Sequence, residues 1–255
     1  MQADDTQFTI RLARDEEDLR AAQRLRYTVF VEELGGDGPL VDHDQGLERD
    51  RFDAFYDHLV LADEACGGEI VGVYRVMRHD QAKQAGQFYS EDEYDLSTLK
   101  TSGRRIMELG RSCLAEGYRG GVAMFHLWNG LARYVAEHGI EILFGVASFH
   151  GTNTQDLRQP LSLLHHRHLA PEALRVTAMP DHFQRMDLLP EAEIDRRAAM
   201  LQMPALIKAY LRLGGFVGQG AFVDHAFNTI DVCLVMDTAR LSARQKSIYA
   251  KGVDL

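Results

Sequence analysis

The sequence predicts a mixed α/β domain, in which strands and helices share a sheet without strict alternation. In the first half of the chain, apolar runs with strand or helix periodicity follow one another as strand, helix, two hairpin strands, strand, helix, strand. Residues 155–213 are then typical of helix and loop, and residues 229–236 predict a late strand that rejoins the sheet. The 255 residues, 45% of them hydrophobic, suit a single domain over 1–255. We expect its core sheet and helices at 8–150 and a mainly helical extension with the late strand at 151–255.

Each element of the first half has its own local signal. Alternation of apolar and polar residues predicts the first strand at 8–12, and acidic residues 15–18 precede a run with helical spacing that ends at Gly35. Polar residues fill 80–103, which we expect to be a loop. The remaining expected elements are hairpin strands at 58–63 and 70–77 around Gly67-Gly68, a strand at 106–114, a helix at 122–138 closed by Gly139, a strand at 140–149, and helix starts at Pro190 and Pro204.

Charge and composition exclude several classes of function. The net charge of −10 disfavours nonspecific nucleic-acid binding, which depends on neutralising phosphates. Residues 1–7 are polar and acidic, which is unlike a signal peptide, and no apolar run approaches the ~20 residues that a membrane span needs. Three widely separated cysteines fit reduced thiols. We therefore expect a cytoplasmic protein, and leave open a peripheral contact with the inner membrane.

The most informative segment is the strand that carries Glu108 and Arg111. In a regular strand these side chains, three residues apart, point to opposite faces, but a bulge at Gly110 would bring both toward one side. A carboxylate beside such a bulge could accept the proton of an amine while a freed N–H polarises a carbonyl. The alternative is a structural ion pair between Glu108 and Arg111, and the residues alone leave both interpretations open.

Residues 118–121, Tyr-Arg-Gly-Gly, lie between that strand and the next helix. Backbone N–H groups at a helix start bind phosphate, and glycine lets the ligand approach closely. The turn at Arg119, Gly120 and Gly121 could hold the phosphate of phosphopantetheine or the pyrophosphate of coenzyme A. An ordinary strand-to-helix turn would have the same sequence.

The sequence predicts no metal site and no catalytic thiol. His165 and His168 share a helical face, but no cysteine or glutamate motif accompanies them, and zinc needs three or four ligands. Cys113 lies in a strand without a histidine beside it, and the chain contains no Gly-x-Ser-x-Gly motif.

Several spacings resemble those of acyl-homoserine-lactone synthases, which are GNAT-fold enzymes. The matching motifs, in the same chain order, are Arg26-x-x-x-Phe30, Phe52-Asp53, Gly72-Val73-Tyr74-Arg75 and Glu108-x-x-Arg111. The resemblance implies a GNAT-like acyltransferase fold, here with a helical insertion or extension in the C-terminal half. It also implies an acyl donor carried by acyl carrier protein.

The sequence is more similar still to the ornithine N-acyltransferases that make lyso-ornithine lipid. The resemblance covers about residues 10 to 250, and its motifs are Arg24-Leu25-Arg26-Tyr27-x-Val29-Phe30, Phe52-Asp53-x-x-x-Asp57-His58-Leu59, Phe88-Tyr89-Ser90, Glu108-Leu109-Gly110-Arg111-Ser112-Cys113, Pro160-Leu161-Ser162-x-Leu164-His165-His166 and Pro204-x-Leu206-Ile207-Lys208-x-Tyr210-Leu211-Arg212-Leu213-Gly214. The histidine run is thereby explained as a family feature.

Two departures affect the choice of donor and acceptor. Many GNAT enzymes carry Arg/Gln-x-x-Gly-x-Gly/Ala at the phosphate turn, whereas Val122 and Met124 stand three and five residues after Arg119 here. This favours a carrier-protein donor over coenzyme A. Tyr56 stands where lactone synthases have their second acidic residue, which disfavours lactone synthesis.

Together, these residues lead to the prediction of an N-acyltransferase that moves a 3-hydroxyacyl or long acyl group from acyl carrier protein to an amino acid, ornithine above others. Glu108 is the expected proton acceptor, directly or through water, and Arg111 is expected to orient it or to contact the donor. No cofactor is expected besides the acyl-phosphopantetheine co-substrate. The acceptor pocket is predicted from Arg26, Phe30, Asp53, Asp57, His58 and Arg75, and the donor site from Gly110, Ser112, Arg119, Gly120, Gly121, Arg104 and Arg105.

Some alternatives remain open. Arg26 and Arg75 could equally be partners of structural ion pairs. The acceptor could be glutamine or tyrosine, the enzyme could be a lactone synthase that requires S-adenosylmethionine, or the chain could be an acyl-carrier-binding or lipid-sensing module without catalysis. For the donor, Lys100, Arg104, Arg105 and Arg119 could form a local basic patch that attracts the acidic carrier protein despite the net charge.

Overall fold

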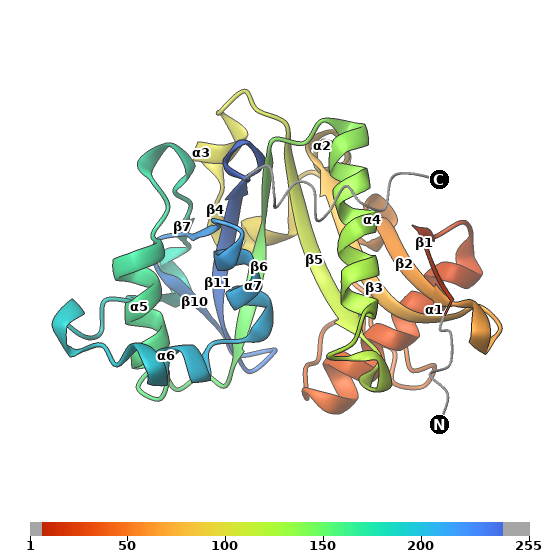
Figure 1. The fold of residues 1–255 in the computed structure, drawn as a ribbon, viewed down its shortest axis with the longest axis horizontal. Helices are drawn as coiled ribbons and strands as arrows, with labels where there is room; N and C mark the ends of the chain where they lie inside the picture. Colours follow the sequence, from red (N-terminus) through yellow and green to blue (C-terminus); the bar gives the residue numbers. More distant parts are fainter. Residues whose placement is uncertain (1–6, 242–255) are drawn as a thin grey trace. The chain divides into compact units, whose positions relative to one another are not determined.

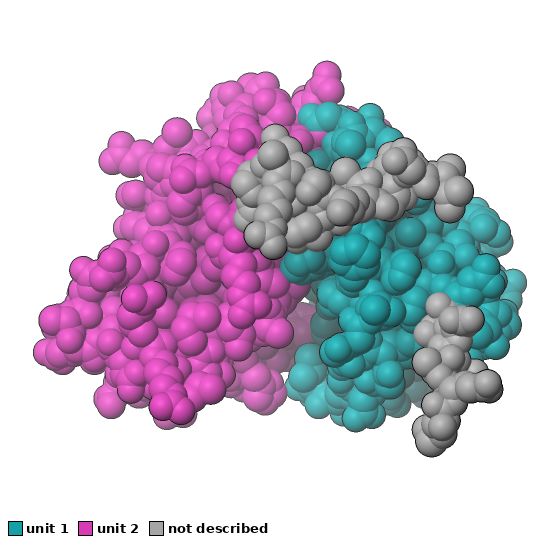
Figure 2. All heavy atoms as spheres, in the orientation of Figure 1, with its two compact units in different colours: residues 1–77, 109–139, 243–255 teal, residues 78–108, 140–242 magenta. Residues whose placement is uncertain are grey.

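The chain forms two compact units, shown in different colours in Figure 2, in a computed structural model that describes residues 7–241. Of these residues, 7–77 and 109–139 belong to unit 1, and 78–108 and 140–241 belong to unit 2. The expectation about a signal peptide concerns residues 1–7, of which only Gln7 is described. Within residues 7–241, no helix has both the length and the apolar character to cross a membrane.

Unit 1 is an antiparallel meander with two helices packed on it (Figure 1). Its strands pair in the order β1-β2-β3-β5, and β5 contributes to this unit from Leu109 onward. In chain order its elements are β1 (Phe8–Leu12), α1 (Glu16–Arg26), a π-helical segment (Tyr27–Glu33), a 3-10 turn (Asp53–Phe55), β2 (Asp57–Asp63), a 3-10 turn (Glu64–Cys66), β3 (Glu69–Arg78), β5 (Ile106–Leu114), a 3-10 turn (Glu116–Tyr118) and α4 (Ala123–His138).

The two helices of unit 1 cover opposite faces of the meander. Val60 packs with Ala22 and Leu25 of α1 in one buried cluster. The next residue, Leu61, points to the other face and lies opposite Ile10 of β1. Ile10 meets α4 at Gly130, where an added Cβ would lie 2.3 Å from the Ile10 side chain. The glycine therefore allows α4 to approach β1 closely.

Unit 2 is built on the long antiparallel pair of β6 and β11, whose strands run side by side over nine residues each. The first residues of β5 pair with β6 in parallel, from Ile106 with Ile142 to Glu108 with Phe144, so the strand arrangement is mixed. The pairing order is β5-β6-β11-β10-β8, and β9 also pairs with β11. The other elements are α2 (His79–Ala85), a 3-10 turn (Tyr89–Asp92), β4 (Tyr94–Asp95), α3 (Ser97–Lys100), β6 (Ile142–His150), α5 (Arg158–His168), β7 (Thr177–Ala178), β8 (Phe183–Gln184), α6 (Arg196–Gln202), α7 (Ala205–Arg212), β9 (Phe216–Val217), β10 (Ala221–Asp224), β11 (Thr229–Asp237) and 3-10 turns at Glu172–Leu174, Pro180–His182, Glu191–Glu193 and Thr238–Arg240.

The predicted α/β class is confirmed, but the predicted loop at residues 80–103 is wrong. This segment contains α2, a 3-10 turn, β4 and α3. Among its many polar residues are four apolar side chains that are completely or almost completely buried: Phe88, Tyr94, Leu96 and Leu99. Pro190 precedes only a 3-10 turn, whereas Pro204 stands directly before α7, as predicted.

Candidate functional site

The largest concentration of buried charge in unit 1 centres on Asp53. Its Oδ1 atom accepts hydrogen bonds from Arg26 Nη1 and Arg75 Nη1, both at 2.7 Å, and its Oδ2 atom accepts one from Gln23 Nε2 at 3.0 Å. Arg26 and Arg75 are both 0% exposed. These arginines come from α1 and β3, so α1 packing on the meander brings them onto one carboxylate.

Two further carboxylates and a third arginine complete this network. Glu48 accepts from Arg26 Nε at 2.5 Å and from Arg111 Nε at 3.1 Å. Asp50 lies 2.7 Å from Arg75 Nη1 and 3.5 Å from Arg111 Nη2. The network thus contains three arginines and three carboxylates, and the opposite charges offset the cost of burial.

Arg111 is the arginine of this network that keeps some exposure, with 13% of its side chain accessible. Its guanidinium carbon lies 6.0 Å from the ring centre of Phe30 in the π-helical segment. Its φ is +50°, in the left-handed region that costs a residue with a Cβ about 1–3 kcal/mol and is common at functional sites. The backbone irregularity expected at Gly110 therefore falls on the next residue.

The pKa values in the network reflect this balance of burial and charge. Burial alone would raise the pKa of Asp53, but Arg26 and Arg75 hold it well below its ordinary value. Glu48 behaves in the same way, since Arg111, Arg26 and Arg75 outweigh burial and lower its pKa. Both carboxylates are therefore ionised near neutral pH.

His58 and Asp57, which we predicted for an acceptor pocket, lie at the start of β2. Burial lowers the pKa of His58, so its ring is neutral, and its Nε2 atom lies 3.0 Å from the backbone oxygen of Asp53. Asp57 is half-buried and accepts a hydrogen bond from the Tyr134 hydroxyl of α4 at 2.5 Å. His58 thus contacts the segment that carries Asp53, whereas Asp57 bonds to a different helix.

Glu108, the predicted proton acceptor, is 1% exposed and lies in unit 2. Its Oε2 atom accepts the N–H of Tyr89 at 2.9 Å, and its Oε1 atom accepts the N–H of Ser90 at 2.7 Å. Both donors belong to the 3-10 turn that the sequence did not predict. These two N–H groups hold the carboxylate in place.

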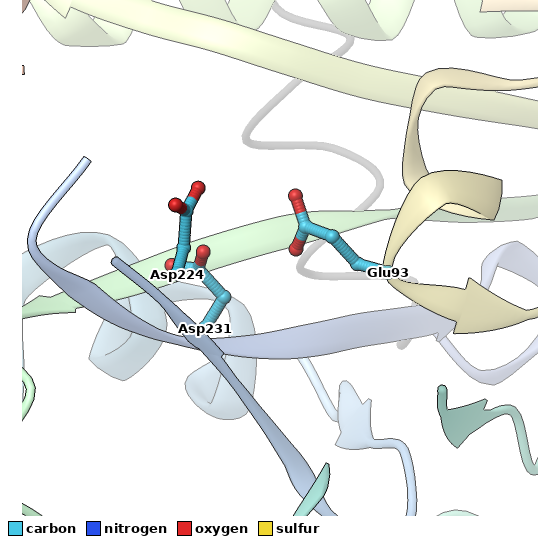
Figure 3. Close-up of side chains that lie close together, drawn as sticks. All are labelled: Glu93, Asp224 and Asp231. Atoms are coloured by element: carbon cyan, nitrogen blue, oxygen red, sulfur yellow. The ribbon is translucent and has the colours of Figure 1, made fainter. Parts of the chain in front are cut away.

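Unit 2 also contains a group of three carboxylates, from Glu93, Asp224 and Asp231 (Figure 3). One oxygen from each lies within 4.8 Å of the others, and Glu93 and Asp231 are buried. Glu93 and Asp224 also line a hollow of about 320 Å³, together with Tyr89, His182, Phe222 and His225. Oxygen ligands of this kind suit an ammonium group or a hard cation, although Ca²⁺ takes about six to eight of them.

The expected donor-site residues lie around the C-terminal half of β5 and the turn after it. An added Cβ at Gly110 would come no closer than 4.0 Å to Arg75, so space does not require glycine there. The side-chain oxygen of Ser112 is buried and has no hydrogen-bond partner among residues 7–241. Gly120, which has a φ of +76°, and Gly121 lie in the turn before α4, where a phosphate was predicted to bind.

Most cations of the predicted basic patch are already paired with acidic side chains. Arg104 donates to both oxygens of Asp237, at 2.6 and 2.9 Å. The other pairs are Lys100 with Glu91 at 2.5 Å and Arg119 with Glu33 at 2.7 Å. Arg105 is exposed. These pairs reduce the positive charge that the patch could offer to an acidic partner.

The cysteines are free thiols, and two of them are buried. Burial raises the pKa of Cys113 to about 12, so this thiol is protonated at neutral pH and a poor nucleophile.

Glu48 and Asp50 were missed by the sequence analysis. They follow Leu47, which is 2% exposed although it lies in a segment rich in glycine and aspartate. One apolar residue at the end of a polar loop, followed by acidic residues at 48, 50 and 53, was the available signal that this loop returns to the core.

Comparison with known proteins identifies the family. Residues 25–129 match the model of the acetyltransferase (GNAT) domain. The chain is 59% identical to an L-ornithine N(alpha)-acyltransferase from Rhodobacter capsulatus over 251 residues, which are 97% of this chain and 96% of the relative. It is 42% identical to an L-ornithine N(alpha)-acyltransferase from Brucella abortus, over 94% of this chain and 88% of that protein.

The chain belongs to the L-ornithine N(alpha)-acyltransferase family. As a member, it is an acyltransferase enzyme, which confirms the predicted resemblance and removes the alternative of a non-catalytic module.

Several solved structures of other proteins have a fold similar to that of this chain. The acyl-homoserine-lactone synthase LasI aligns with a TM-score of 0.52 at 17% identity, over 98% of both chains. The lactone synthase BjaI, solved with MTA, has a TM-score of 0.52 at 14% identity, over 93% of this chain and 82% of the synthase. At these identities the likeness concerns the fold, and it confirms the predicted GNAT-like architecture.

Proposed function

We propose that the protein transfers a fatty acyl group, 3-hydroxylated or long, from acyl carrier protein to the α-amine of ornithine, forming lyso-ornithine lipid. The 59% identity to the Rhodobacter capsulatus L-ornithine N(alpha)-acyltransferase, over nearly the whole of both chains, carries this proposal. The buried Glu108 carboxylate, held by two backbone N–H groups, supports it chemically.

The amine must lose a proton before it can attack. An α-amine is mostly protonated near neutral pH, and its nitrogen then has no lone pair for the thioester carbonyl. Glu108 accepts that proton, directly or through a water molecule. The amine nitrogen forms a bond to the carbonyl carbon and gives up a second proton. The carbon–sulfur bond breaks, and the sulfur takes up that proton and leaves as the phosphopantetheine thiol.

Arg111 is the residue of the unit 1 network best suited to contact a substrate. Arg26 and Arg75 are fully buried and bonded to carboxylates, which favours their role as structural partners over direct contact. Arg111 retains partial exposure and offers a planar group that pairs well with a carboxylate or a carbonyl oxygen. Phe30 lies beside it as an apolar wall.

The side-chain ammonium of ornithine requires an acidic partner. Asp53 and Asp57 were predicted for this role, and Asp53 already accepts hydrogen bonds from two arginines and a glutamine. Asp53 is thus committed to this network, and we propose the half-buried Asp57 for the ammonium.

An assay of donor and acceptor tests the proposal. The purified protein is incubated with 3-hydroxyacyl carrier protein, or with the same acyl group on coenzyme A, and with ornithine, lysine, glutamine, tyrosine or S-adenosylmethionine. We expect acylation of ornithine at the α-nitrogen from the carrier protein, read by tandem mass spectrometry. Acylation of glutamine with ornithine ignored would refute the acceptor, and a preference for coenzyme A would refute the donor.

The docking of the carrier protein is tested separately at Arg105, an exposed cation of the predicted basic patch. We expect Arg105→Glu to raise the Michaelis constant for the carrier protein severalfold at low salt and to leave that for ornithine unchanged. Arg197→Glu, an exposed cation on α6, is the matched control. Equal constants for the Arg105 variant and the wild type would place docking elsewhere.

A further inference from the structure

Glu48 occupies a position that connects three separate segments of unit 1. Its backbone N–H donates to the backbone oxygen of Gln23 in α1 at 3.1 Å, and its side chain is 1% exposed. The neighbouring Leu47 is also buried and pairs through its backbone with Asp42. Backbone hydrogen bonds therefore fix the position of Glu48 independently of its side-chain contacts.

The two oxygens of Glu48 are divided between two arginines. Oε2 binds Arg26, which contacts it through both Nε and Nη2, and Oε1 binds Nε of Arg111 at 3.1 Å. Arg26 belongs to α1, and Arg111 to β5, so one carboxylate joins a helix to a strand that follows 85 residues later in the sequence. Charge-assisted hydrogen bonds of this kind are short and directional.

The guanidinium of Arg111 depends more on such a contact for its position than those of Arg26 and Arg75 do. Arg26 and Arg75 are enclosed on all sides, whereas Arg111 is partly exposed and has a left-handed backbone. A residue with that conformation keeps it only when its surroundings enforce it. Asp50 also contacts Arg111, but at 3.5 Å, while its closer bond, at 2.7 Å, goes to Arg75. Glu48 thus contacts Arg111 more closely than Asp50 does.

We propose that Glu48 is a positioning residue for acyl transfer, which fixes the guanidinium of Arg111 and the backbone of β5 at that position. The inference rests on the proposed function in one respect, because it takes Arg111 as the residue of the network that meets a substrate. The carboxylate of Glu48 acts through Arg111 and is therefore not a catalytic residue. Its loss misplaces Arg111 while the fold of unit 1 persists.

A double-mutant cycle tests this role. Glu48→Gln removes the charge at nearly constant shape, and we expect kcat to fall by about 10²-fold, as a misplacement of ~1 Å can cause. Arg111→Ala should cause a similar loss. If Glu48 acts through Arg111, the double variant Glu48→Gln/Arg111→Ala is no slower than Arg111→Ala alone, within about threefold. If the two losses multiply instead, Glu48 has a separate structural role and the proposal fails.

Two further variants keep the test decisive if Glu48→Gln does not fold. Glu48→Asp keeps the charge but is one methylene too short to span both arginines, so it should lose most of the activity and retain most of the stability. Asp18→Asn is the matched control, because it removes a partly buried carboxylate that pairs with Arg11 in the same unit. It should lower stability and change kcat by less than about twofold. Wild-type activity in Glu48→Asp would overturn the proposal.

The cycle is measured with whichever amino acid the wild-type enzyme acylates. If ornithine is ignored but another amine is acylated, the proposed acceptor is wrong and the test of Glu48 is unaffected. If ornithine is acylated and the Glu48 and Arg111 losses multiply, the proposed function stands and the positioning role is refuted.

Discussion

Each compact unit buries a glutamate, and the two are held by different chemistry. Glu48 in unit 1 bonds to the side chains of Arg26 and Arg111, whereas Glu108 in unit 2 accepts the backbone N–H groups of Tyr89 and Ser90. If Glu48 were protonated, a fully buried arginine would lose a counter-charge, which is costly. The backbone donors of Glu108 carry no charge to leave uncompensated. The first arrangement is that of a buried ion pair, and the second holds a carboxylate through backbone groups, which fits the proton-accepting role that we propose for Glu108.

The largest expected effect comes from Glu108→Gln. The amide cannot accept a proton from the amine, so we expect turnover to fall by about 10² to 10⁴-fold. One of the two backbone donors would then face an NH₂ group, which should cost about 1 kcal/mol of stability. Stopped assays of the amide product, with circular dichroism to verify folding, measure both effects. Near-normal turnover in a folded variant would remove Glu108 from the mechanism.

The second effect concerns stability and comes from Arg26→Ala. This change leaves Glu48 and Asp53 buried with part of their counter-charge missing, and breaking a buried pair in this way costs about 3–5 kcal/mol. Arg20→Ala is the control, since Arg20 pairs with Glu16 on the same helix at 47% and 77% side-chain exposure, and such a pair contributes about 0.5 kcal/mol or less. Urea denaturation compares the two. Equal losses would mean that the network is not the stabilising element we infer.

The pH dependence of stability sharpens the comparison further. The pKa values of Glu48 and Asp53 are lowered in the folded state, so their contribution is fully present above their unfolded values of about 4.3 and 3.9. It is lost as pH falls through the folded values. We therefore expect the urea midpoint to decrease as pH falls below about 5, and to decrease less steeply in Asp53→Asn, which is less stable at neutral pH. Parallel curves for the variant and the wild type would contradict this.

Local patterns were sufficient to predict much of the fold. Apolar alternation predicted β1, two apolar runs around the Gly67-Gly68 turn predicted the hairpin of β2 and β3, and Gly139, with its φ of +59°, ends α4 as predicted. The class followed because these signals depend on neighbours in the sequence. The short elements at 79–100 were missed, since their burial depends on a few apolar residues among many polar ones whose contacts are distant in the chain.

Several residues of the candidate site could be predicted from the sequence, but the hydrogen bonds between them could not. Arg26, Asp53 and Arg75 were named from family-like spacing, and the structure joins them through one carboxylate. The apolar Leu47, followed by acidic residues, indicates that this polar loop returns to the core, but no short-range pattern indicates that Glu48 bonds to Arg26 and Arg111. Tyr89 and Ser90 could not be predicted as partners of Glu108 either. They bind its carboxylate through their backbone N–H groups, so the identity of their side chains does not indicate the contact.

The smallest expected effect concerns the carboxylates of Glu93, Asp224 and Asp231. In unit 1 the buried carboxylates of Glu48 and Asp53 bond to arginines, whereas those of Glu93, Asp224 and Asp231 lie close to one another, an arrangement that a bound cation could also satisfy (Figure 3). The proposed reaction needs a proton acceptor and a thioester, and the sequence contains no metal-binding motif. We therefore expect dialysis against a chelator to change turnover by less than about twofold, well below the loss of about 10²-fold or more that follows removal of a general base. Asp224→Asn separates the two possibilities: if chelation abolishes activity, and Mg²⁺ or Ca²⁺ restores it in the wild type but not in this variant, the three carboxylates form a functional metal site.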